Sequence, residues 1–253
     1  MAKNLVKYIA SCSFGKDSLA TILLCLKHGL PLDEVVYCEV MFDRSISGEV
    51  PEHRDFIYNR AIPFLKENGI KVVTLHSEMT FIQSFYRVCK RGKSSGMINA
   101  WPLCNRCCIQ RDCKMPPLKA YQNSLGKDVI RYVGIAYDEQ ERLIRLEEGK
   151  TISLLEKYHI TEHDAVELCK QAGLYSPIYQ FASRNGCFFC PNAKMRELRH
   201  LYDHHPDLWG RLLECQKAPN KATELCNRDY TITEIDELFQ AEDQQLCLFG
   251  NVA

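Results

Sequence analysis

A strand that runs straight into a glycine-containing turn and then a helix limits this chain to few architectures. Residues 6–18 read Val-Lys-Tyr-Ile-Ala-Ser-Cys-Ser-Phe-Gly-Lys-Asp-Ser. The N–H groups of such a turn and the positive end of the following helix point donors at one spot, and Lys16 adds a charge. The segment therefore predicts a phosphate-binding loop at the end of a strand. The alternative is an ordinary turn with a helix cap at Asp17 or Ser18.

Apolar runs with strand and helix periodicity alternate through the N-terminal half of the chain. The pattern predicts helices over 18–28, 52–68 and 81–89, and strands over 34–42 and 70–75. Strands separated by helices of this length favour an α/β fold with a doubly wound, mostly parallel sheet. Ligands of such sheets bind at the carboxyl ends of the strands, where the predicted phosphate loop lies.

The C-terminal part of the chain is predicted to be mainly helical. Helices are expected over 161–173, 192–205 and 233–241, with Pro206 interrupting the second of these patterns. We therefore expect a nucleotide-binding α/β domain over residues 1–145 and a mainly helical region over 146–253.

Composition restricts the function classes. The chain has 253 residues, 46% of them hydrophobic, and a formal net charge of zero. The neutral balance argues against a globally basic nucleic-acid binder but leaves local basic clusters open. No stretch approaches ~18 uncharged apolar residues, so we expect a cytoplasmic protein without a membrane partner. Whether it forms a homo-oligomer is left open.

Fourteen cysteines are many for a cytoplasmic chain, where clustered thiols favour metal or redox chemistry over disulfides. Most of them lie in apolar runs and are expected to be core residues. Two groups differ: Cys104, Cys107, Cys108 and Cys113 lie within ten positions, and Cys187 and Cys190 form a CxxC turn followed by proline. A CxxC turn lets two thiolates reach one metal, so the two groups could close a single site.

The order Ser-Phe-Gly-Lys-Asp-Ser at 13–18 resembles the SGGKDS signature of the PP-loop superfamily, which includes the N-type ATP pyrophosphatases and the phosphoadenosine phosphosulfate (PAPS) reductases. Phe14 stands where a second glycine is usual. The resemblance implies that ATP binds with Mg²⁺, that Lys16 stabilises phosphate charge and that Asp17 or Asp43 holds the metal ion. It implies these nucleotide-binding residues: Ser11, Ser13, Phe14, Gly15, Lys16, Asp17, Ser18, Asp43 and Gly134.

A second segment, residues 132–142, is similar to the GIRxDES...R segment of sulfonucleotide reductases, where a strand ends at a glycine and is followed by acidic residues and an arginine. By this resemblance Asp138 and Arg142 join Lys16 and Asp17 as catalytic residues. Ala136 replaces the first arginine of that segment, which weakens the case for (phospho)adenylylsulfate as substrate. The alternative is a solvated helix start in which Glu139 pairs with Arg142.

The cysteine pattern resembles the Cys-Cys...CxxC motif of assimilatory adenylylsulfate reductases. That resemblance implies a [4Fe-4S] cluster held by Cys107, Cys108, Cys187 and Cys190. One alternative is a zinc site in which Cys104 replaces Cys108. Another is a cluster with three ligands, Cys108, Cys187 and Cys190, and one open iron.

Three functions follow from these resemblances. The first is ATP-dependent adenylation of an acceptor, with pyrophosphate release, for sulfur transfer to tRNA or DNA. The second is a thiol-dependent reductase acting on an adenylylated sulfonucleotide, although the tail offers only Cys247 in place of the family's Glu-Cys-Gly motif. The third is a zinc-stabilised, non-catalytic nucleotide- or nucleic-acid-binding module. A cysteine desulfurase or a thiol reductant is an expected partner of the enzymes.

Overall fold

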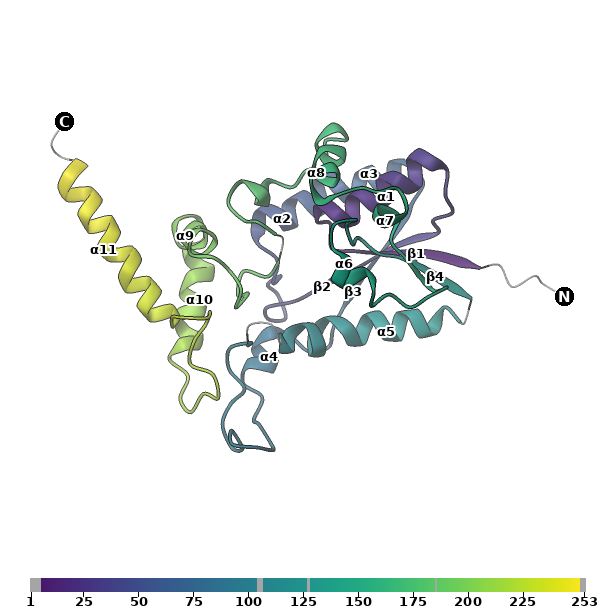
Figure 1. The fold of residues 1–253 in the computed structure, drawn as a ribbon. Coiled ribbons are helices and arrows are strands. Elements are labelled where there is room, and N and C mark those ends of the chain that lie inside the picture. The colour runs from purple at the N-terminus through teal and green to yellow at the C-terminus, as the bar shows by residue number, and fades with distance from the viewer. Residues whose placement is uncertain (1–5, 104–106, 127, 185, 251–253) are drawn as a thin grey trace. The chain divides into compact units, whose positions relative to one another are not determined.

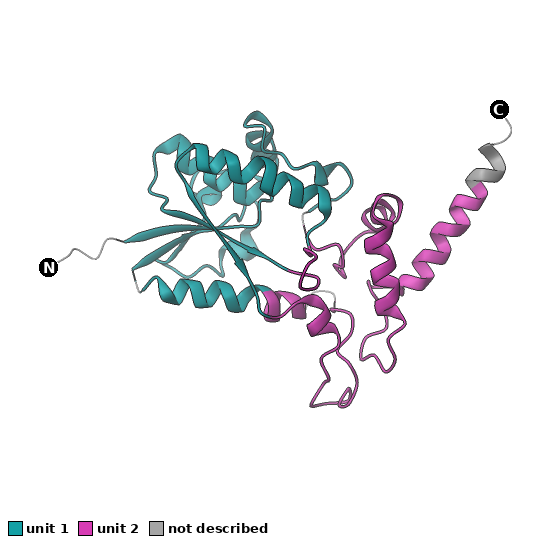
Figure 2. Ribbon diagram, turned by 180° about the vertical axis from the view of Figure 1, so that it is seen from behind, with its two compact units in different colours: residues 1–40, 49–78, 114–185 teal, residues 41–48, 79–113, 186–253 magenta. Residues whose placement is uncertain are grey.

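The computed structural model describes residues 6–103, 107–126, 128–184 and 186–250. The chain forms two compact units (Figure 2). The first comprises residues 1–40, 49–78 and 114–185, and the second comprises residues 41–48, 79–113 and 186–253. Residues 146–184 thus pack with the N-terminal sheet, while the helices after residue 186 belong to the second unit. In the described part of the chain, no helix combines the length and apolarity that a membrane span requires.

The first unit contains a five-stranded parallel sheet, as the sequence predicts. Its strands are β1 (Lys7–Cys12), β2 (Glu34–Glu39), β3 (Lys71–His76), β4 (Val129–Tyr132) and β5 (Thr151–Ile152). Their order is β3-β2-β1-β4-β5, with Ile9 of β1 opposite Glu34 of β2 and Lys7 opposite Val129 of β4. The strand that carries the phosphate loop is therefore the central one.

Helices cover both faces of this sheet. Figure 1 shows α5 on one face and α1, α3 and α8 on the other. The helical elements of the unit are α1 (Lys16–His28), α2 (Pro51–Phe56), a π turn (Ile57–Ala61), α3 (Ile62–Glu67), α5 (Met115–Ser124), α6 (Gln140–Leu143), α7 (Leu154–Lys157), α8 (Glu162–Gln171) and a 3-10 turn (Pro177–Gln180). Buried side chains of α1, β2 and α3, among them Leu19, Val35 and Leu65, form the core. The doubly wound α/β architecture is confirmed.

The second unit is built around aromatic side chains. Its helices are α4 (Phe81–Phe85), α9 (Met195–His204), α10 (Pro206–Gln216) and α11 (Ile232–Gly250). Phe189 stacks on Phe81 at 4.1 Å between ring centroids, and Phe42 lies 5.1 Å from Phe188 and 5.2 Å from Phe81. Because Phe188 and Phe189 separate Cys187 from Cys190, the buried rings anchor the CxxC turn in this core.

Candidate functional site

The predicted phosphate loop joins β1 to α1. Gly15 is the residue before α1 and has no side chain with which to cap this helix. The Ser18 hydroxyl donates to the Gly15 carbonyl at 2.9 Å, and the Phe14 N–H donates to Cys12 Sγ at 3.2 Å. Burial raises the pKa of Cys12 to about 11, so this thiol stays protonated near neutral pH. A helix N-terminus at the carboxyl end of a central parallel strand favours an anion.

Phe14 occupies the left-handed region, with φ of 56°, at the position where the resemblance expects glycine. Its side chain is fully buried, and its ring meets Tyr37 edge-on with 5.1 Å between centroids. The loop conformation is thus retained without the glycine, because the phenyl ring is held in the core. Phe14 contributes backbone shape and packing to the loop.

Lys16 lies between two carboxylates. Its Nζ atom is 2.9 Å from Asp17 Oδ1 and 2.9 Å from Glu162 Oε2, and its side chain is 12% exposed. Burial acts to lower the pKa of Lys16, but Glu162 and Asp17 outweigh it and the pKa lies above its ordinary value. For Asp17, burial and the nearby charges of Glu162 and Glu139 raise the pKa against the opposing effect of Lys16. The site therefore holds a charged lysine beside a carboxyl that is readier than usual to take a proton.

The segment after β4 supplies further acidic groups to the same unit. Asp138 Oδ1 accepts the N–H of Glu162 at 3.1 Å, which ties this segment to the start of α8. Glu139 accepts the N–H of Ala136 at 3.1 Å and pairs with Arg142. Asp138 thus contacts the residue that binds Lys16, whereas Arg142 is engaged with its neighbour. Their catalytic roles stay predictions.

Gly134 has a packing role that the sequence did not indicate. A Cβ atom at this position would lie 2.6 Å from both the carbonyl carbon of Asp17 and the amide nitrogen of Ser18. Only glycine lets the segment after β4 approach the first turn of α1 this closely. Its close approach shapes the loop, and direct contact with a nucleotide stays a prediction.

Three residues that the sequence did not indicate hold the loop. His53 is fully buried, with Nε2 3.1 Å from the Ser13 carbonyl and Nδ1 2.9 Å from Ser176 Oγ. Burial lowers its pKa, so the ring is neutral near pH 7, and the carbonyl requires the proton on Nε2. The Tyr179 hydroxyl accepts the N–H of Lys16 at 2.9 Å. With Glu162, these residues are distant in sequence from the loop, and no local pattern marks them.

Asp43 lies in the second unit, in the loop that follows β2. Its Oδ1 atom accepts the N–H groups of Ser45 and Ile46, each at 2.8 Å, and Oδ2 is 3.5 Å from Arg211. Burial opposes these contacts, but together they hold the pKa of Asp43 below its usual range. The carboxylate stabilises this loop, and its part in nucleotide or Mg²⁺ binding stays a prediction.

The four predicted cluster ligands all belong to the second unit, and each is half-buried. Burial raises the pKa of Cys107, as do the neighbouring thiols of Cys108 and Cys190, while the N–H groups of Gln110 and Ile109 lower it. Asn99 Nδ2 donates to Cys108 Sγ at 3.4 Å. Cys107 therefore interacts with both cysteine groups, and hydrogen-bond donors are available to the sulfur atoms.

The spacing of these thiols bears on the metal. Sulfur atoms around one tetrahedral Zn²⁺ lie about 3.8 Å apart, because Zn–S bonds are about 2.3 Å. Among the residues that the structure describes, no three thiols lie within 4.8 Å of one another. The zinc alternative also requires Cys104, and it stays a prediction. Cys113 is fully buried, and Cys104 lies outside the described residues.

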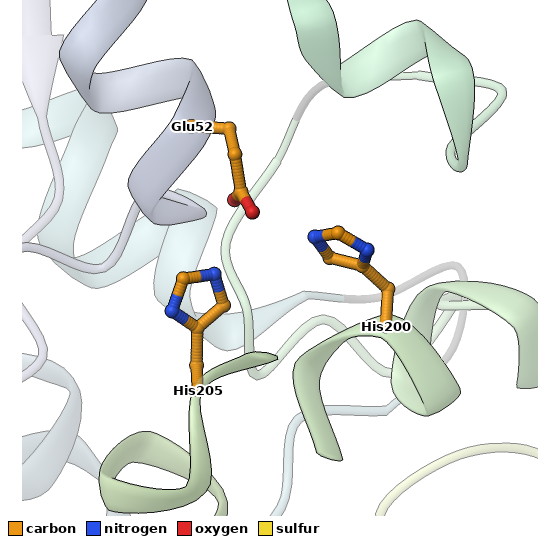
Figure 3. Close-up of side chains that lie close together, drawn as sticks. All are labelled: Glu52, His200 and His205. Carbon is orange, nitrogen blue, oxygen red and sulfur yellow. The ribbon is translucent and has the colours of Figure 1, made fainter. Parts of the chain in front are cut away.

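Histidines of the second unit lie near one another on α9 and at its end. The His200 ring is 4.5 Å from that of His204 and 6.0 Å from that of His205, centroid to centroid. Figure 3 shows the rings of His200 and His205, together with Glu52 of α2 in the first unit. His200 and His204 thus lie one helical turn apart on α9, and His205 is the residue that follows this helix.

Comparisons with known proteins are sparse. No protein-family model matches this chain, and no curated protein matches it. Nine chains of solved structures match. One of them is the U34-tRNA thiolase NcsA from Methanococcus maripaludis with its [4Fe-4S] cluster, which is 15% identical; the match covers 93% of this chain and 82% of that chain with a TM-score of 0.43. A likeness at this TM-score carries no conclusion about cofactor or substrate.

Proposed function

We propose that this protein is an ATP-dependent enzyme that adenylates an acceptor oxygen, releases pyrophosphate and then exchanges AMP for sulfur. The observation that carries the proposal is the charged Lys16 at the N-terminus of α1, at the carboxyl end of the central strand. This arrangement binds phosphate groups in many unrelated proteins. The sulfur step rests on the four cysteines of the second unit and on the family resemblance.

The loop residues have distinct tasks in this proposal. The Lys16 ammonium stabilises negative charge on the phosphates as the acceptor oxygen attacks the α-phosphorus and pyrophosphate leaves. Asp17, beside it, would hold Mg²⁺, which would neutralise the same phosphates. Glu162 orients Lys16 through its 2.9 Å ion pair, and His53 and Tyr179 fix the loop backbone. The acceptor then carries AMP, which is a good leaving group for attack by sulfur.

The thiols of Cys107, Cys108, Cys187 and Cys190 would hold a [4Fe-4S] cluster, which supplies the site that carries the sulfur. Neighbouring groups of the chain donate hydrogen bonds to two of these sulfur atoms. Backbone N–H groups favour the Cys107 thiolate, and the Asn99 amide donates to Cys108 Sγ. Buried Phe188 and Phe189 hold the CxxC turn rigid. Four thiols from two segments match the donor set of such clusters.

The test is made on protein purified without oxygen. About four irons and absorbance near about 400 nm are expected. With ATP and an acceptor, pyrophosphate release is expected, and Lys16→Ala should reduce it by about a hundredfold or more. Lys66→Ala, which removes an exposed lysine of α3, is the matched control. Cys190→Ser should lose iron, whereas Cys89→Ser should keep it.

Other outcomes select other functions. Sulfite release from adenylylsulfate, without pyrophosphate release from ATP, would select the reductase. A colourless protein that contains zinc and turns over neither ATP nor adenylylsulfate would indicate the third function, a non-catalytic binding module. Pyrophosphate release that Lys16→Ala does not change would overturn the assignment of the loop.

A further inference from the structure

The second unit contains a cavity that the proposed reaction does not use. Its volume is about 430 Å³, and its walls are residues 191–195, at the start of α9, and residues 227–230, in the turn before α11. The cavity is defined within this unit alone. A volume of this size is within the range of small-molecule sites.

The turn that forms one wall is held by its own hydrogen bonds. Asn227 Oδ1 accepts the N–H groups of Asp229 at 3.0 Å and Tyr230 at 2.9 Å. The buried Cys226 donates its N–H to the Tyr230 carbonyl at 3.0 Å. These hydrogen bonds fix the backbone of the turn. The side chains of Arg228 and Tyr230 are exposed and do not pack in the hydrophobic core.

The other wall continues directly from the CxxC turn. The Cys190 N–H donates to the Cys187 carbonyl at 3.0 Å, and the Ala193 N–H donates to the Cys190 carbonyl at 2.9 Å. The cavity therefore begins one residue after a proposed cluster ligand, at Pro191. A ligand held here lies against the segment that carries two of the four thiols.

The cavity carries two cations that no carboxylate neutralises. Lys194 lines one wall and Arg228 the other, and neither side chain forms a hydrogen bond or an ion pair within the described part of the chain. Asp229 is the one acidic side chain among the lining residues, so the formal charge of the wall is positive. Tyr230, 39% exposed, adds an aromatic ring. Free cations beside an exposed aromatic ring suit a phosphate joined to a flat base.

We infer that this cavity is a subsite for one nucleotide residue of a single-stranded polynucleotide. The base stacks on Tyr230, and the adjoining phosphates contact Lys194 and Arg228. The inference rests on the proposed function in one respect, because it identifies the acceptor as a nucleic acid that binds beside the cysteine segment. A free mononucleotide offers the same phosphate and base, and the test below distinguishes it from a polynucleotide.

The test measures binding of a fluorescent single-stranded oligonucleotide, and of AMP as a competitor, to the full chain over a range of salt concentrations. Tyr230→Ala should weaken oligonucleotide binding by about tenfold, because base stacking is lost, and Tyr230→Phe should bind as the wild type does. Lys194→Ala and Arg228→Ala should each reduce the slope of log K against log salt by about 0.7. Lys66→Ala is the matched control and should change neither quantity.

The outcomes separate this inference from the proposed function. Lys16→Ala should reduce pyrophosphate release by about a hundredfold or more and leave oligonucleotide binding unchanged. Oligonucleotide binding that is insensitive to Tyr230→Ala and to both cation variants would overturn the subsite, whatever the ATP assay shows. Binding of AMP that depends on Tyr230, without oligonucleotide binding, would overturn the polynucleotide and assign the cavity to a free nucleotide.

Discussion

Phe14 shows how one residue can break a local rule. A residue with a Cβ atom in the left-handed region costs about 1–2 kcal/mol. Burying a phenylalanine side chain returns roughly 1.5–3 kcal/mol. Because the ring is fully buried against Tyr37, packing outweighs the backbone strain and the loop keeps its shape.

Two substitutions at this position separate the strain from the packing. Phe14→Ala should destabilise the protein by about 3–5 kcal/mol, because it leaves a cavity and keeps the positive φ. Phe14→Gly leaves a similar cavity but relieves the strain, so it should be the more stable of the two by about 1 kcal/mol. Urea unfolding of both variants measures the difference. A Phe14→Ala protein as stable as Phe14→Gly would show that the backbone at 14 is unstrained.

Glu34 makes the stability of the first unit depend on pH. Burial raises its pKa, but Lys71, Tyr121 and Lys7 outweigh this effect and hold the pKa at about 2, below the ordinary 4.5. The folded form therefore binds a proton less readily than the unfolded form. The stabilisation is complete above the ordinary pKa and is lost as the pH falls toward 2, by an amount on the order of 3 kcal/mol.

Glu34→Gln tests this dependence. The variant should be less stable than the wild type near neutral pH, and its stability should fall less steeply between about pH 6 and about pH 3. Urea unfolding at a series of pH values gives both slopes. Equal slopes for the two proteins would mean that other carboxyl groups control the acid transition.

Helices agree with the sequence pattern best where proline or a capping residue marks their ends. The helix predicted over 52–68 exists, but it contains the π turn Ile57–Ala61, since Pro63 has no N–H to donate to the preceding turn. Pro206 begins α10 immediately after α9, because proline is well tolerated in a first turn. The helix predicted over 81–89 ends at Phe85, and the last helix extends to Gly250. The sequence did not indicate α5 or β5.

The N-terminal cap of α8 lies next to Glu162, so its loss should also affect the phosphate loop predicted around Lys16. The Thr161 side chain accepts the N–H of Asp164, and Asp164 binds back to the Thr161 N–H, which together form a capping box. Thr161→Ala should cost about 1 kcal/mol, and it should also reduce pyrophosphate release because Glu162 is the next residue. Thr161→Ser keeps the cap and is the control. A serine variant as impaired as the alanine variant would assign the effect to the lost methyl group.

A substitution at Gly134 tests whether the segment after β4 must lie close to the first turn of α1. Gly134→Ala should lower both the melting temperature and pyrophosphate release, because its Cβ meets backbone atoms of Asp17 and Ser18 that cannot move independently. Gly210→Ala is the control: its Cβ meets nothing within 4 Å, and alanine favours the helix α10. Full activity of Gly134→Ala would show that the loop adjusts freely.

At the scale of the whole molecule, unfolding of the second unit can be followed separately by tryptophan fluorescence. The chain has two tryptophans, Trp101 and Trp209, and both belong to the second unit. Trp101 packs against Phe85, and Trp209 Nε1 donates to Asp236 at 2.6 Å. Tryptophan fluorescence therefore reports on the unit that contains the proposed cluster ligands.

Loss of the proposed cluster should destabilise this unit selectively, because the binding free energy of a metal centre contributes to the free energy of folding. The fluorescence melting temperature should fall by several degrees in cluster-free protein, since about 1 kcal/mol corresponds to about 2–4 °C at this size. Cys89→Ser should melt as the wild type does. An unchanged fluorescence transition after iron removal would contradict a structural link between the cysteines and this unit.

Much of the architecture was encoded locally. The alternation of periodicities predicted a parallel sheet, and the turn at Gly15 predicted a phosphate loop at the end of a strand, because the type of an element and the start of a helix depend on residues that are near one another in sequence. The folded sheet makes that strand the central one. The contacts that hold this loop in place came from tertiary packing. Glu162 reaches Lys16, His53 reaches Ser13 and Gly134 reaches Asp17 across long stretches of chain, and only the folded core sets such distances.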